Sequence, residues 1–82
     1  MNELFKYDNN FQLTGTGYNY LYVPQSTHPG YELISATNAN WDLNSRQVIS
    51  IAHQGTNLVL FFDAGVGVGT TINVNLLWIK RN

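Results

Sequence analysis

The sequence predicts an all-β protein, a small antiparallel β-sandwich or barrel. Three observations lead to this fold class: apolar and polar residues alternate along several short segments, turn-forming residues separate those segments, and none sustains the 3.6-residue apolar period of a helix. The 82 residues suffice for one small core. We therefore predict an N-terminal arm over residues 1–10, where Asp8-Asn9-Asn10 favours a turn, and a single β-domain over residues 11–82.

Four strands are predicted before the last third of the chain, over residues 11–14, 18–23, 31–36 and 46–53. The second ends at Pro24. His28-Pro29-Gly30 predicts a type II turn, because proline suits its first central position and glycine its second. The asparagine-rich segment 37–45 is predicted to be a loop with at most one helical turn, near residues 40–45.

The last third holds the most apolar strands. Residues 58–62 are apolar on both sides of the pleat, whereas residues 71–79 alternate. Between them, residues 63–70 carry three alternating glycines and are predicted to form a wide loop between antiparallel strands, flexible or tightly packed. A phosphate site there is disfavoured, because no helix follows the glycines. The predicted core is Leu58, Leu60, Phe62, Ile72, Val74, Leu76 and Trp78.

Low charge favours association with other chains. Only 11% of residues are charged and the net charge is −1, while eleven asparagines and seven threonines supply most of the polarity. Four apolar residues have no predicted cover within the chain, namely Val66, Val68, Leu77 and Ile79. Almost no lysine guards the predicted strand edges. We therefore expect a homo-oligomer whose edges are closed by assembly.

Composition also argues against several function classes. We find no signal peptide and no run of 18 apolar residues, so we expect no membrane insertion. Four basic residues offer no patch for nucleic acid. The sequence has no nucleophile elbow, no HExxH motif and no cysteine, so we predict that the protein is not an enzyme and uses no cofactor. Three carboxylates brought together by folding are the alternative, Glu32, Asp42 and Asp63.

Metal binding is also weighed and disfavoured. Asn40-x-Asp42-x-Asn44 has the spacing of a calcium loop, but Ser45 and Ile51 stand where such a loop needs glycine and glutamate. His28 and His53 have no cysteine or second carboxylate at a metal-binding spacing. We expect ordinary turn and strand-end hydrogen bonding at these positions.

The candidate ligand-binding residues are the tyrosine row Tyr18, Tyr20 and Tyr22, together with Asn40, Trp41 and Asp42 in the asparagine-rich loop. Aromatic faces can stack on sugar rings while amides bind the hydroxyls. The same row is equally suited to a face packed on a second sheet or on a neighbouring subunit. The sequence leaves both interpretations open.

The low-charge, cysteine-free, amide-rich strands and the closing strand Thr70-Thr71-Ile72-Asn73-Val74-Asn75-Leu76-Leu77-Trp78-Ile79 resemble the small β-structured heads or cement (decoration) proteins of phage and viral particles. The resemblance implies a homotrimer, located in a virion, that binds a host surface protein or glycan or clamps a capsid. Outside a virus we expect a cytoplasmic protein or one released without a signal peptide. The predicted function is thus a structural or attachment module, and the alternative is a small carbohydrate-binding, lectin-like domain.

Overall fold

The computed structural model describes residues 3–39, 46–54 and 57–81, which form six strands and one turn of 3-10 helix. In chain order these elements are β1 Phe5–Thr14, β2 Tyr20–Val23, the 3-10 helix Gln25–Thr27, β3 Tyr31–Asn38, β4 Val48–Gln54, β5 Asn57–Phe62 and β6 Thr71–Lys80. They build two antiparallel three-stranded sheets that pack face to face. The all-β prediction is confirmed, and of its two alternatives the fold is a sandwich.

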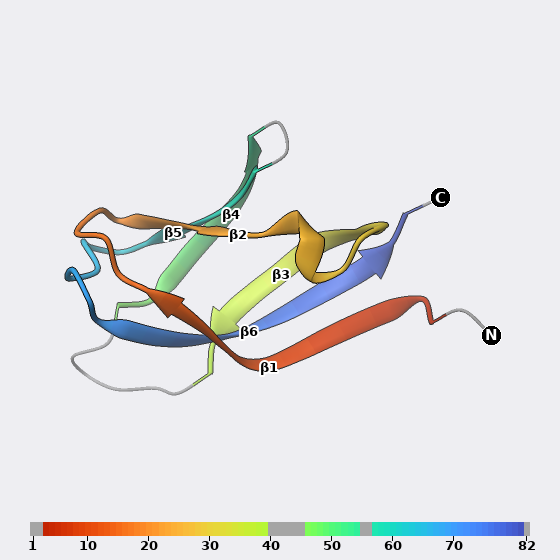
Figure 1. Cartoon of the computed structure of the whole chain (residues 1–82), viewed down its shortest axis with the longest axis horizontal. Coiled ribbons are helices and arrows are strands. Elements are labelled where there is room, and N and C mark those ends of the chain that lie inside the picture. The colour runs from red at the N-terminus through yellow and green to blue at the C-terminus, as the bar shows by residue number, and fades with distance from the viewer. Residues whose placement is uncertain (1–2, 40–45, 55–56, 82) are drawn as a thin grey trace.

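Sheet A has the strand order β1-β6-β3 and sheet B the order β2-β5-β4, and sheet A lies below sheet B in Figure 1. The chain changes sheet at every connection except the one from β4 to β5. The predicted pairing across the loop of residues 63–70 is therefore wrong. Because β5 already has β2 and β4 as neighbours, and β6 has β1 and β3, neither strand has a free edge for the other.

The core lies between the inner faces of β5 and β6. All seven predicted core residues are buried, and Leu60, Val74, Leu76 and Trp78 are completely inaccessible to solvent. Val59 is also buried, at 1% exposure, although it points away from the core on the outer face of sheet B. The strand over residues 58–62 is thus covered on both faces, as the sequence predicts.

Two glycine-containing segments close one end of the sandwich, at the left of Figure 1. The N–H groups of Gly15 and Gly17 donate to the carbonyl oxygens of Thr70 and Val66, each at 2.7 Å. Val66 N–H donates back to Tyr18 O at 2.9 Å, and Val66 is only 1% exposed. The prediction that Val66 lacks cover is therefore wrong, because the loop folds over the open end and inserts this side chain between the sheets.

The long edge strands are interrupted by β-bulges. Each has one residue more than its partner at one place: between Asp8 and Phe11 in β1, at Ile34 in β3 and at Ile49 in β4. The remaining edge strand, β2, has only four residues. Bulges and short strands are two ways in which proteins prevent strand addition. The expectation that the edges lack such protection is thus wrong.

The bulge in β1 lies at the end of the predicted N-terminal arm. β1 begins at Phe5, so most of the predicted arm is the first half of a strand paired with β6. Asn10 has a φ of 60°, a left-handed conformation that asparagine tolerates, and its N–H donates to Asn75 Oδ1 at 3.2 Å. The turn-forming triplet therefore makes a bulge inside a strand.

Several local predictions hold, with shifted boundaries. The Tyr31 N–H donates to His28 O at 3.1 Å across Pro29 and Gly30, and Gly30 has a φ of 82°, which confirms the type II turn. β2 starts at Tyr20, two residues later than predicted. The helical turn expected near residues 40–45 lies outside the described residues.

The close approach of Gly15 to the loop of residues 63–70 leads to a stability prediction. A Cβ on Gly15 would overlap the carbonyl oxygen of Gly67 and lie 2.7 Å from Val66 Cγ1. We expect Gly15→Ala to lower the free energy of unfolding by about 3 kcal/mol, because backbone and a packed core side chain must move. Urea denaturation measures this change.

Gly67→Ala, in the facing segment of the same contact, is the matched control, because its Cβ would meet the Thr70 hydroxyl at 3.1 Å. We expect it to cost less than about 1 kcal/mol. Equal stability of the two variants would show that the two segments do not interlock in this way.

Candidate functional site

The most distinctive surface is an aromatic ridge on the outer face of sheet B, which we call the tyrosine face. Tyr20 and Tyr22 alternate along β2 and pair across the sheet with Phe61 and Val59, and Tyr18 precedes the strand. Tyr18 and Tyr22 are 62% and 52% exposed. The tyrosine face consists of Tyr18, Tyr20, Tyr22, Gln54, Val59 and Phe61. The predicted row is therefore an outer sheet face and not part of the core between the sheets.

The three tyrosine rings are packed on one another. The rings of Tyr18 and Tyr20 are stacked, with centroids 5.5 Å apart and an angle of 16° between their planes. Tyr22 meets Tyr20 edge to face at 5.8 Å, and Phe61 lies 6.2 Å from Tyr20. Since Tyr20 contacts three neighbouring rings, the row forms a continuous packed ridge and not a line of separate, outward-facing platforms.

Shallow grooves flank this ridge. One has a volume of about 270 Å³ and lies between the ridge and β4, where Gln54 is exposed at its rim and Val59 is buried. The other has a volume of about 210 Å³ and is bordered by Thr16 and Leu21. No charged residue lines either groove in the part of the chain that the structure describes. Contacts here must come from aromatic surface, hydroxyl groups and one amide.

The other predicted ligand-binding residues, Asn40, Trp41 and Asp42, lie outside the described residues. The residues with the calcium-loop spacing, Asn40-x-Asp42-x-Asn44, also lie outside the described residues. The structure therefore assigns only the tyrosines of the predicted set to a common surface.

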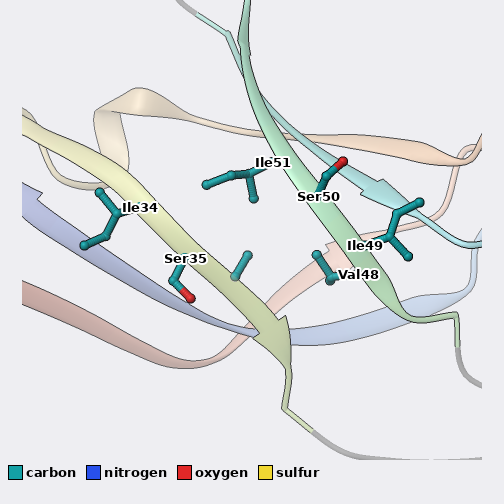
Figure 2. A pocket seen from close by; sticks show the side chains of 7 residues that line it. Ile34, Ser35, Val48, Ile49, Ser50 and Ile51 are labelled. Atoms are coloured by element: carbon teal, nitrogen blue, oxygen red, sulfur yellow. The ribbon is translucent and has the colours of Figure 1, made fainter.

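A third hollow, of about 210 Å³, opens between the edges of β3 and β4. Figure 2 shows Val48 and Ile51 on the side of β4 that faces β3. Both side chains pack against the core, so the hollow is shallow. At one end Asn38 bridges the strands, because its side-chain amide donates to Arg46 O at 2.6 Å and accepts from Val48 N–H at 2.8 Å. Its polar side chains are Ser35 and Ser50, and no charged side chain is among the described residues that line it.

A hydrogen-bonded cluster at the other end of the sandwich was not apparent from the sequence. The Asp8 carboxylate accepts from Trp78 Nε1–H at 2.8 Å and lies 2.8 Å from His28 Nε2. The His28 ring also meets the Trp78 ring edge to face at 5.2 Å. Asp8 satisfies the one polar group of the completely buried Trp78, so the cluster fastens the turn before β3 onto sheet A. One signal was available, since a buried tryptophan at a strand end requires an acceptor.

Several charged side chains of the described residues have polar partners close by. Lys6 Nζ donates to Glu3 Oε1 at 3.0 Å, and this hydrogen bond raises the pKa of Lys6. Arg46 Nε donates to Gly65 O at 2.9 Å, and Asp63 Oδ1 accepts from Gln47 N–H at 3.1 Å. Of the three carboxylates weighed for catalysis, Asp63 thus caps a backbone N–H, while Asp42 lies outside the described residues.

Two other kinds of site are absent from residues 3–39, 46–54 and 57–81. No group of three or more histidine, cysteine, aspartate or glutamate side chains is placed to hold a metal ion. No helix there has the length and apolar character required to cross a bilayer.

Comparison of the chain with protein-family models, with curated proteins and with solved structures gives no match. Function must therefore be inferred from the geometry of the surface.

The Asp8 cluster gives a testable prediction. Asp8→Ala removes the acceptor of the Trp78 N–H and the partner of His28, so we expect the free energy of unfolding to fall by about 1.5 to 3 kcal/mol. Asp8→Asn retains one oxygen and should lose less than half as much. Thermal and chemical denaturation of the two variants measure these losses of stability. An Asp8→Ala protein as stable as the wild type would show that the cluster does not fasten the turn.

Proposed function

We propose that this chain is a non-enzymatic structural or attachment module of a larger assembly and that the tyrosine face is its contact surface. One observation carries the proposal: an uncharged ridge of packed tyrosines stands on the outer face of sheet B, with Tyr18 and Tyr22 more than half exposed. Tyrosine is enriched, and charge is depleted, at the centres of protein interfaces. The surface therefore fits a protein partner that is itself nearly uncharged.

The absence of a reactive group from these grooves supports a role without catalysis. In the described residues, the grooves present tyrosine and threonine hydroxyls and one amide, with no carboxylate or histidine to act as acid or base. In the part of the chain that the structure describes, His28 is paired with a carboxylate, but this pair belongs to the Asp8 cluster and not to the grooves. The resemblance of the strands to phage and viral head or cement proteins is the support for a virion as the assembly.

Carbohydrate binding is the second candidate, and one feature favours it. The groove beside the ridge combines Tyr20, Tyr22 and Phe61 with the Gln54 amide, and its volume of about 270 Å³ suits a single sugar ring. The ring packing argues the other way, because Tyr18 and Tyr20 turn their faces toward each other. A sugar platform needs exposed faces, so we favour the protein partner.

Photo-crosslinking tests the contact surface. A benzophenone analogue of phenylalanine at position 22 should give one major protein adduct in the particle or cell that contains the chain. The same analogue at Ile49, which is 64% exposed and lies on β4 of the same sheet, is the control. Once that partner is purified, Tyr22→Ala should weaken its binding by about 10- to 100-fold, as for an aromatic anchor.

Equal adducts from both positions, or none from position 22, would contradict the proposal.

A glycan array tests carbohydrate binding, the second candidate function. Specific sugar binding that disappears in Tyr22→Ala would assign the face to carbohydrate, whereas an array without binding agrees with a protein partner.

A further inference from the structure

A second apolar surface lies on the opposite face of the sandwich, on the outer side of sheet A. Phe5 pairs with Ile79 and Tyr7 with Leu77 across β1 and β6, and these positions alternate with the inward-facing Leu76 and Trp78. We call Phe5, Tyr7, Leu77 and Ile79 the sheet-A patch. Phe5 and Tyr7 are 46% and 62% exposed, and Leu77 and Ile79 are half-buried. Leu77 and Ile79 thus remain without full cover, as the sequence predicts.

The border of this patch has one charge of each sign. Glu32 on β3 pairs with Ile79 across the sheet, and its Oε1 lies 3.8 Å from Arg81 Nε. Both side chains are substantially exposed, at 46% and 61%. Further along β6 the face becomes polar at Asn75 and Asn73. A patch of this kind is complementary to itself, because a two-fold axis through it can place Glu32 of one copy beside Arg81 of the other.

The edges and the faces together limit how copies can associate. The bulges in β1, β3 and β4 and the short β2 disfavour addition of strands edge to edge. Association of the sheet-A patch with the tyrosine face of another copy would produce an open stack, because the two surfaces point in opposite directions. Only contact between like faces closes after two copies.

From these observations we infer that two copies of this chain form a dimer in which the sheet-A patches pack on each other about a two-fold axis. A stable dimer buries about 800 Å² per copy, which is roughly one seventh of the 5261 Å² accessible surface of the chain. One broad face of a molecule of 41 × 26 × 19 Å is large enough. This dimer is an alternative to the trimer that the viral resemblance implies, and it leaves both tyrosine faces exposed at opposite ends.

Sedimentation velocity from micromolar to submillimolar concentration tests the dimer. The wild-type chain should sediment with twice its 9.3 kDa mass. Tyr7→Asp sets two like charges against each other across the axis and should weaken the dimer by about 100-fold or more. Tyr22→Asp makes the same change on the tyrosine face and should dimerise like the wild type. Because these two substitutions affect different faces, loss of partner binding and loss of the dimer can be distinguished.

A charge-reversal series tests the axis itself. Glu32→Arg and Arg81→Glu should each weaken the dimer, and the double variant should restore it. Circular dichroism verifies folding, and Phe5→Asp replaces Tyr7→Asp if the latter unfolds. A monomer at submillimolar concentration, a trimer, or a dimer that is sensitive to Tyr22→Asp and not to Tyr7→Asp or Phe5→Asp would each overturn the inference.

Discussion

The contact between the inner faces of β5 and β6 is the interaction on which the rest of the structure depends. β6 contributes Leu76 and Trp78 to this contact and β5 contributes Leu60, all without solvent exposure. Each of these two strands also holds both edge strands of its sheet. The chain changes sheet at nearly every connection, so few paired strands are neighbours in sequence. Short loops therefore cannot determine most of the strand pairings, and burial between the two central strands must stabilise them instead.

The same two strands explain why the outer surface is unusually apolar. A two-layer sandwich buries one face of each sheet, yet β5 and β6 are apolar on parts of both faces. On sheet B the cover comes from within the chain, because Val59, which lies between Tyr22 and Ala52 on the neighbouring strands, is only 1% exposed. On sheet A, Phe5 and Tyr7 cover Leu77 and Ile79 only in part. The bulged edges and apolar faces together favour contact through faces over strand addition.

Alternation along the chain was sufficient to predict the all-β class and the buried face of β6, because side-chain direction in a strand follows from position alone. It could not predict which strands pair, since nothing local in residues 63–70 shows that the loop changes sheet. The bulges at Ile34 and Ile49 shift the faces of β3 and β4, and the burial of Val66 depends on distant glycines. In the candidate site, the sequence predicted that the three tyrosines form one row. It could not predict how their rings pack, because Phe61 from a neighbouring strand takes part in that packing. Asp8 was missed because its partners lie twenty and seventy residues away.

We propose that apolar outer faces, and not strand edges, make copies of this chain associate. Nuclear magnetic resonance on a sample that mixes isotope-labelled and unlabelled chains tests it most directly. We expect intermolecular contacts between the methyl groups of Leu77 and Ile79 in one copy and the rings of Phe5 and Tyr7 in the other. Intermolecular contacts between backbone amide groups of β3 or β4 would contradict it, because they would show that the copies join edge to edge.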